Sequence, residues 1–368
     1  MERVHKQLLD RRDQILASVQ VHQGFVSCIR RLPPEILSGI FVQCLPPETL
    51  TEPDARAAPL LLMRVCRGWR EVAHGTPRLW CSLSVRPSRF LGPQQPKDLV
   101  FYHHWLSRAR GCPLSLAVDT GEPSHYPGWQ HEVTEFLQPY TSRVVRLHVT
   151  FRSNTVPDLL LGDLPLLEHL TLNGHIHGHA NIARVQPAPR LRRLTLDGFV
   201  FSAGVLSAFN SYWTHLTQLR VTLSTRYLLN REINGLFVLT LLELCPHLQD
   251  FVLSSVSIPQ YIMEAGNVRV VTHSHLRSFD VEVLYGIPCL LGVLTLPALK
   301  HLKITGIGRG TWRQNEFSAF VTRSRCPLET LKLYGGQLFS EEDQAEYLAL
   351  IPTLKHVDLS LDTLGVAV

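Results

Sequence analysis

The sequence lacks several features that mark common classes of protein. It has no apolar run of about 18 residues, the length that crosses a bilayer as a helix. The first residues, Met1 to Lys6, are rich in charge where a secretory signal would have an apolar core. Lys and Arg are scattered, and the net charge is only +5, so no nucleic-acid footprint is indicated. We therefore expect neither a membrane segment nor a nucleic-acid partner.

Paired cysteines are also missing. The eight cysteines include no C-x-x-C pair and follow no regular spacing, which favours free thiols in a reducing compartment. Hydrophobic residues make up 45% of the chain and charged residues 18%, a composition typical of a globular protein. These observations predict a cytoplasmic or nuclear protein.

Candidate chemical sites are few. His175, His177 and His179 alternate, so two of them could bind a metal from one side of an extended segment, but no Cys or acid lies close by. A solvated loop is the favoured interpretation. The loop Gly306–Gly310 lacks the Gly-Lys-Ser/Thr ending of a phosphate-binding loop, and no G-x-S-x-G or H-E-x-x-H motif is present. We expect no catalytic residue, no metal and no cofactor.

The stretch from Leu32 to Trp80 has the pattern of a small helical module. Pro33 and Pro34 suit a first helical turn, where a missing N–H costs nothing. A first apolar face is predicted from helical spacing, with these members: Ile36, Leu37, Ile40 and Phe41. A second helical face is predicted with these members: Leu62, Val65, Cys66, Trp69, Val72 and Ala73.

Several segments surround these faces. The connection 45–59 carries four prolines and is expected to be a loop. Residues 1–23 have a helical apolar stripe, made of Val4, Leu8, Ile15 and Val19. This stripe either packs against the helical module or forms a short coiled coil. The pattern predicts a strand over 81–85 and a helix over 98–110 that stops at Gly111.

From about residue 144 the chain repeats the pattern Leu-x-x-Leu-x-Leu. Successive units start roughly 23 to 32 residues apart, close to the spacing of leucine-rich repeats. Nine units are found, starting at Val144, Leu167, Leu191, Leu216, Leu248, Leu276, Leu299, Leu328 and Leu354. Each L-x-L puts two apolar side chains on one face of a short strand, and stacked strands bury that face together.

Helical patterns separate the predicted strands. They include Val205 to Phe209, Phe317 to Val321, and a helix that starts with a capping box between Ser340 and Asp343. In this last helix we expect Ala345 and Leu348 to face the core. The long step from Leu216 to Leu248 predicts an insertion or a longer helix near 227–244.

The motifs L-P-P-E-I-L, C-R-x-W and P-x-L-W occur in order between Leu32 and Trp80, and this stretch resembles an F-box. The resemblance implies docking to the SKP-type adaptor of a cullin-RING ubiquitin ligase. The matching positions are Leu32, Pro33, Ile36, Leu37, Ile40, Val65, Cys66 and Trp69. The spacing does not separate core residues from residues that contact the adaptor.

The repeats resemble the leucine-rich repeats that follow F-boxes, as in the expanded fungal families, although they lack an asparagine ladder. The side chain between the two strand apolars points away from the core, and curved repeat faces often bind proteins. Candidate target-binding residues are therefore Thr171, Thr195, Arg220, Asp280, Lys303, Lys332 and Asp358; Val252 occupies the same position in its repeat.

The expected fold is mixed α and β: a small helical F-box followed by an irregular leucine-rich repeat α/β solenoid. The expected boundaries are an N-terminal helix over 1–23, the F-box domain over 24–88 with its core at 32–80, a linker and helix over 89–111, and the solenoid over 112–368. The resemblance implies a non-catalytic substrate receptor of an SCF-type ubiquitin ligase, joined through the adaptor to a cullin. The alternative is an interaction scaffold without ligase activity.

Overall fold

A computed structural model describes most of the chain. The described residues are 2–26, 28–46, 50, 52–87, 97–121, 128–151, 162–174, 188–199, 213–223, 234–257, 269–285, 287–308, 312–336 and 339–361. They form two compact units, Met1–Leu83 with His104–Cys112, and Ser84–His103 with Pro113–Val368. No helix among these residues is both long and apolar enough to span a bilayer.

The first unit is helical. Its elements are α1 (Glu2–Val26), η1 (Cys28–Arg31), α2 (Pro34–Gln43), α3 (Leu62–Val65), α4 (Arg67–Gly75) and η2 (Pro77–Trp80). Pro33 is the N-cap of α2 and Pro34 is its first residue, as predicted. This placement is favourable because an N–H at either position would have no partner within the helix, so its absence in proline costs nothing.

The second predicted helical face is broken at Cys66, so the expectation of one continuous helix is wrong. The backbone of Cys66 is extended, with φ −159° and ψ 173°, and it separates α3 from α4. Its Sγ accepts a hydrogen bond from the N–H of Trp69 at 3.5 Å. Cys66 thus caps α4, because its thiol occupies the position that a Ser or Asp oxygen often takes at a helix start.

Two tryptophans form the core beneath α4. Trp80 is fully buried and donates a hydrogen bond from Nε1 to the carbonyl of Ala73 at 2.9 Å. Trp105 belongs to α5 (Lys97–Arg108) and meets Trp80 edge to face at 4.9 Å. The guanidinium of Arg108 lies over the Trp80 ring and donates to His74 Nδ1 at 3.0 Å. The end of α5 therefore packs within the first unit.

Helix α1 extends past the predicted end of its stripe, through Gly24 to Val26. Leu8, Ile15 and Val19 are all exposed, so these members of the stripe do not pack on the helical module as the first interpretation expects. The fourth member of the stripe, Val4, is not among the residues whose side chains the structure describes.

The second unit is built on parallel strands. They are β1 (Ser82–Val85), which begins in the first unit, β2 (Leu114–Asp119), β3 (Val144–Phe151), β4 (His169–Gly174), β5 (Arg193–Phe199), β6 (Gln218–Leu223), β7 (Asp250–Ser257), β9 (Ser278–Tyr285), β11 (His301–Ile307), β12 (Thr330–Gly335) and β13 (His356–Leu361). These eleven described strands form one sheet in chain order. A small parallel pair joins β8 (Val271–Thr272) to β10 (Leu294–Thr295).

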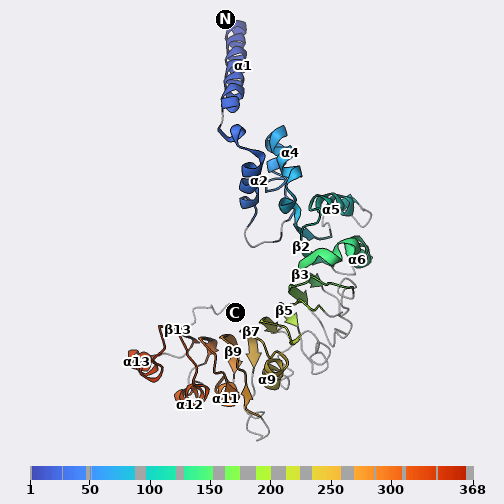
Figure 1. Ribbon diagram of the computed structural model, residues 1–368. Helices are drawn as coiled ribbons and strands as arrows, with labels where there is room; N and C mark the ends of the chain where they lie inside the picture. The colour runs from blue at the N-terminus through green and yellow to red at the C-terminus, as the bar shows by residue number, and fades with distance from the viewer. Residues whose placement is uncertain are drawn as a thin grey trace. The chain divides into compact units, whose positions relative to one another are not determined.

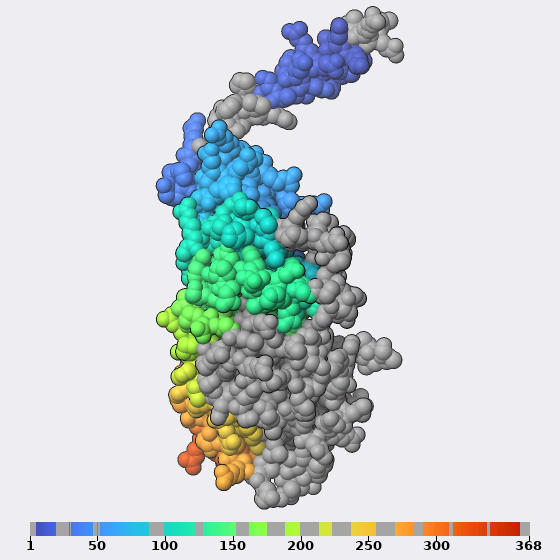
Figure 2. All heavy atoms as spheres, turned by 90° about the vertical axis from the view of Figure 1, so that its right-hand side faces the viewer, coloured from blue at the N-terminus to red at the C-terminus, as the bar shows by residue number. Residues whose placement is uncertain are grey.

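The apolar pattern of the repeats becomes the core of this sheet. From β3 to β12 both strand apolars are buried, for example Leu170 and Leu172, while Val357 and Leu359 on the last strand are only half-buried. Phe251 and Phe279 take the Leu position on neighbouring strands and stack with ring centroids 5.6 Å apart. Successive colours follow one another along the surface in Figure 2 from green to orange, because each repeat lies beside the preceding one.

A repeated hydrogen bond links neighbouring units just before each strand. The N–H of one repeat donates to the carbonyl of the equivalent residue in the preceding repeat, at 2.8 to 2.9 Å. The chain of such bonds runs through Val145, Glu168, Arg192, Thr217, Gln249, Arg277, Lys300, Glu329 and Lys355. These bonds fix the strand register, because every backbone is paired at the same point of its repeat.

The helices of this unit are α6 (Trp129–Leu137), η3 (Gln138–Arg143), α9 (Asn234–Leu244), α11 (Ile287–Val293), α12 (Gln314–Ser324) and α13 (Glu341–Leu350). Figure 1 shows the last four along the outer side of the curved row of strands. Between Leu216 and Leu248, where the sequence predicts an insertion or a longer helix near 227–244, the described residues include helix α9.

Helix α13 confirms one prediction and contradicts another. Ser340 and Asp343 form the expected capping box. Ala345 and Leu348 are exposed, however, and Tyr347 is the buried residue of the helix. The Tyr347 hydroxyl donates to Gln314 and accepts from Trp312 Nε1 at 3.0 Å. These contacts at the start of α12 select the face of α13 that turns inward.

We predict that Gly335→Ala destabilises the second unit by roughly 1–3 kcal/mol, the usual cost of overpacking. A Cβ at Gly335 would overlap the backbone of Ile307, at the point where β11 and β12 shift register. The control Gly292→Ala adds a methyl group to open space on α11 and should be neutral or slightly stabilising. Chemical denaturation measures both, and equal stability of the two variants would contradict the close approach.

We predict that stability falls as pH drops below 6.5, partly through His273. Burial lowers its pKa below the usual 6.5, with His275 and His247 adding to the effect. Nδ1 accepts from the Leu276 N–H at 3.1 Å, so the proton resides on Nε2, which faces the Cys245 carbonyl at 2.8 Å. The folded state favours the neutral ring, and its contribution is complete above pH 6.5 and lost as pH falls.

His273→Asn keeps one donor and one acceptor without a titrating ring. It should reduce the slope of unfolding free energy between pH 6.5 and 5 by up to about 1.4 kcal/mol per pH unit. Urea denaturation at several pH values measures this slope. An unchanged slope would show that His273 is not one of the responsible groups.

Candidate functional site

An open apolar groove lies in the first unit between α2 and α4. Its volume is about 1000 Å³, and its lining includes Leu32, Leu37, Cys66, Trp69 and Pro77. Phe41 of α2 packs on Trp69 of α4 with ring centroids 4.9 Å apart, which joins the two helices that line the groove. An apolar groove of this kind on a small helical unit suits a helix or loop of a partner protein.

The eight predicted adaptor-binding residues fall into three classes of exposure. Leu37 is buried, and Leu32, Cys66 and Trp69 are half-buried in the groove. The remaining four are exposed; Ile36, Ile40 and Val65 keep 54%, 45% and 55% of their surface, and Pro33 is likewise exposed. The structure therefore separates core positions from surface positions, which the spacing could not do.

The first apolar face of α2 is divided. Leu37 and Phe41 point into the unit, whereas Ile36 and Ile40 lie about 100° further round the helix and point out. The prediction that all four share one face is wrong for this reason. Sequence reasoning also missed two exposed apolar residues nearby, Ile29 and Leu61, each 44% exposed. Helical spacing alone gave no signal for either.

A second candidate surface is the polar face of the sheet. The predicted target-binding residues lie opposite one another on neighbouring strands, and we call them the middle row. The row runs Thr171, Thr195, Arg220, Val252, Asp280, Lys303, Lys332 and Asp358. Because the register is continuous, residues far apart in the chain form one surface.

The acidic groups at the C-terminal end of this face are already paired. Asp280 Oδ2 accepts from Lys303 Nζ at 3.0 Å, and Asp358 accepts from the Tyr334 hydroxyl at 2.6 Å. Burial and Asp358 raise the pKa of Tyr334 to about 12, so it remains a donor. This part of the face is therefore close to charge balance.

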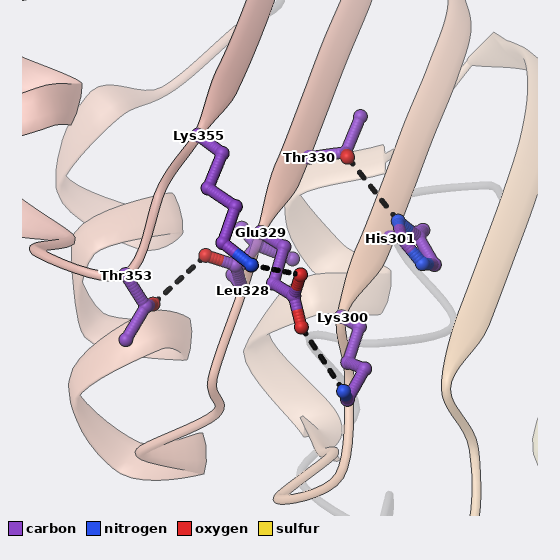
Figure 3. A network of polar contacts seen from close by, with 7 residues as sticks. All are labelled: Lys300, His301, Leu328, Glu329, Thr330, Thr353 and Lys355. Carbon is purple, nitrogen blue, oxygen red and sulfur yellow. Dashed lines mark hydrogen bonds and ion pairs between the residues drawn. The ribbon is translucent and has the colours of Figure 1, made fainter.

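A polar network lies just before the last strands (Figure 3). Glu329 forms two ion pairs. Its Oε2 lies 2.7 Å from Lys355 Nζ, and its Oε1 lies 3.0 Å from Lys300 Nζ. The hydrogen bond from Lys355, followed by that from Lys300, lowers the pKa of Glu329 to about 2. Thr353 adds a hydrogen bond to the Leu328 carbonyl at 2.8 Å. The network joins three consecutive repeats.

Within the described ranges, no group of three or more His, Cys, Asp or Glu is arranged to hold a metal ion. The predicted cluster at His175, His177 and His179 lies outside those ranges, as do Arg309 and Gly310. Gly306, with φ +85°, is part of strand β11. Gly306 and Ile307 thus belong to a strand rather than to a phosphate-binding loop.

Comparison with known families identifies one domain. The F-box-like family matches residues 29–86, which run from η1 through η2 and β1. This interval contains the groove and all eight predicted adaptor-binding residues. A search of curated proteins found no match for the chain.

We predict that Leu37→Ala lowers the unfolding free energy of the first unit by roughly 2–5 kcal/mol, whereas Ile36→Ala changes it little. Leu37 is 6% exposed, but its neighbour Ile36 is 54% exposed. Thermal and denaturant unfolding followed by tryptophan fluorescence measure the difference. Comparable losses in the two variants would contradict the orientation of α2.

Proposed function

We propose that this protein is the substrate receptor of an SCF-type cullin-RING ubiquitin ligase. The observation that carries the proposal is the F-box-like domain at 29–86, which carries an apolar groove and several exposed apolar side chains. F-box domains generally bind SKP-type adaptors and are typically not catalytic. In this role the chain breaks no bond itself.

The adaptor would contact both parts of the apolar surface. Ile36, Ile40 and Val65 offer exposed side chains, while Leu32 and Trp69 line the groove. Apolar groups of this size favour a partner because each one removed from water contributes about 1.5–3 kcal/mol. Leu37 would act indirectly, since it is buried and holds α2 in place.

The second unit would hold the target. We interpret it as an irregular leucine-rich repeat solenoid. This is supported by the regular spacing of apolar pairs, the parallel register and the bond repeated before each strand. The middle row would be its binding face. The boundaries 1–23, 24–88, 89–111 and 112–368 belong to the same proposal.

The proposed mechanism is one of effective concentration. A target bound to the sheet would be held near ubiquitin carried by other subunits, which the adaptor joins through a cullin. We place the protein in the cytoplasm or nucleus, where thiols stay reduced. This placement is consistent with Cys245, a free thiol whose pKa is raised to about 12 by burial.

We predict that Ile36→Ala/Ile40→Ala weakens adaptor binding at least 30-fold without unfolding either unit. The two side chains are exposed, and truncation of an interface anchor often costs about 2 kcal/mol. The matched control Val270→Ala/Leu348→Ala removes two exposed apolar side chains from the second unit. Calorimetric titration with a purified SKP-type adaptor measures the affinity, and circular dichroism checks folding.

Undiminished affinity of the folded Ile36/Ile40 variant would contradict the proposed docking surface. The remaining alternative is a scaffold without ligase activity. In that case the adaptor would bind, but no cullin would co-purify and the abundance of the bound partner would not rise when the protein is deleted.

A further inference from the structure

Three arginines on the polar face of the sheet have no counter-charge. Arg146 lies on β3, Arg193 on β5 and Arg220 on β6, and all three are exposed. Over the part of the chain that the structure describes, none of their side chains forms a hydrogen bond or an ion pair. Asp280 and Asp358, further along the face, are paired as described above. The uncompensated positive charge is thus concentrated on β3 to β6.

The strand register brings these arginines onto one surface. Arg146 lies opposite His169, His169 opposite Arg193, and Arg193 opposite Gln218, two residues before Arg220 on the same strand. Neighbouring strands are about 4.8 Å apart, so the backbones at Arg146 and Arg193 are separated by about 10 Å. Burial lowers the pKa of His169, and the charges of Arg193 and Arg146 lower it further, as expected if both flank the ring.

Acidic residues occupy the opposite end of the same strands. Asp119, Thr150, Asn173 and Asp197 lie opposite one another in that order, close to the carboxyl ends of β2 to β5. Two acids lie close to the arginine row. Glu168 precedes His169, and Asp250 lies opposite Gln218, from whose Nε2 it accepts a hydrogen bond at 2.9 Å. The charge of this face therefore changes from positive at the amino ends of the strands to negative at their carboxyl ends. A bound anion would be attracted to one end and repelled from the other.

We propose that β3 to β6 bind an acidic segment of the target protein, with the carboxylates of at least two Asp or Glu side chains on Arg146, Arg193 and Arg220. This inference rests on the proposed function and specifies the target class. Arginine matches a carboxylate with two parallel hydrogen bonds. In an extended peptide, side chains two residues apart lie on the same face about 7 Å apart, and the long arginine side chains bridge the difference from the roughly 10 Å between the backbones at Arg146 and Arg193.

Separated carboxylates fit this surface better than one phosphate. A single phosphate would require the guanidinium groups to converge on one point. The register instead spreads the three arginines over three strands and two positions along the strand direction. Asp119 and Asp197 would fix the direction of the peptide, because they repel acidic residues at the wrong end.

The test is a display selection of random twelve-residue peptides on the full-length protein, followed by fluorescence anisotropy with the enriched peptides. We expect enrichment of peptides with two or more Asp or Glu, and a loss of affinity of at least tenfold in Arg146→Gln/Arg193→Gln. The charge-matched control Arg12→Gln/Arg313→Gln removes two exposed arginines elsewhere and should bind like the wild type. Adaptor affinity is measured on the same preparations.

Three outcomes would overturn the inference: enriched peptides with no acidic bias, equal losses in both double variants, or preferential binding of a peptide whose only anionic group is one phosphoserine. Each outcome is distinguishable from failure of the proposed function. Loss of adaptor binding by the wild-type protein would contradict the receptor role, whereas intact adaptor binding beside a failed peptide test would contradict only the acidic target.

Discussion

The second unit depends on the common register of its parallel strands. A strand carrying two apolar residues on one face cannot bury them alone, so each repeat is stable only against its neighbours. The hydrogen bonds that precede the strands hold every repeat at the same height, at 2.8 to 2.9 Å. Because side chains alternate along a strand, this register also lines up the polar residues on the opposite face. The same strand register therefore aligns both the buried core and the candidate binding face.

The first unit differs from the second in how completely its apolar side chains are buried. Its core is small and centred on Phe41, Trp80 and Trp105, which are all buried. A unit of this size cannot cover every apolar side chain of its helices. Ile36, Ile40 and Val65 remain exposed, and the unit also carries a groove of about 1000 Å³. Incomplete burial, rather than charge, distinguishes this surface from the sheet.

Much of this arrangement was predictable from the sequence. Leucine spacing located the strands β3 to β7, β9 and β11 to β13, since period-two alternation is a strong local signal, but it missed the short strands β8 and β10. Pro33, Pro34, Ser340 and Asp343 marked helix starts. Helix orientation was not predictable, because it depends on distant partners. Tyr347 turns inward through Trp312 and Gln314, and Cys66 interrupts a spacing that fits one helix. The division of Ile36 from Leu37 likewise needed the packing of Phe41 on Trp69.

The central claim is that one protein carries two separate binding surfaces, with the adaptor on the F-box-like domain and the sheet face left for a target. Hydrogen–deuterium exchange of the full-length protein, with and without a purified SKP-type adaptor, tests it most directly. The account predicts new protection confined to residues 29–80, with unchanged exchange in the strands from β3 to β13. Protection of those strands on adaptor binding, or none in 29–80, would contradict it.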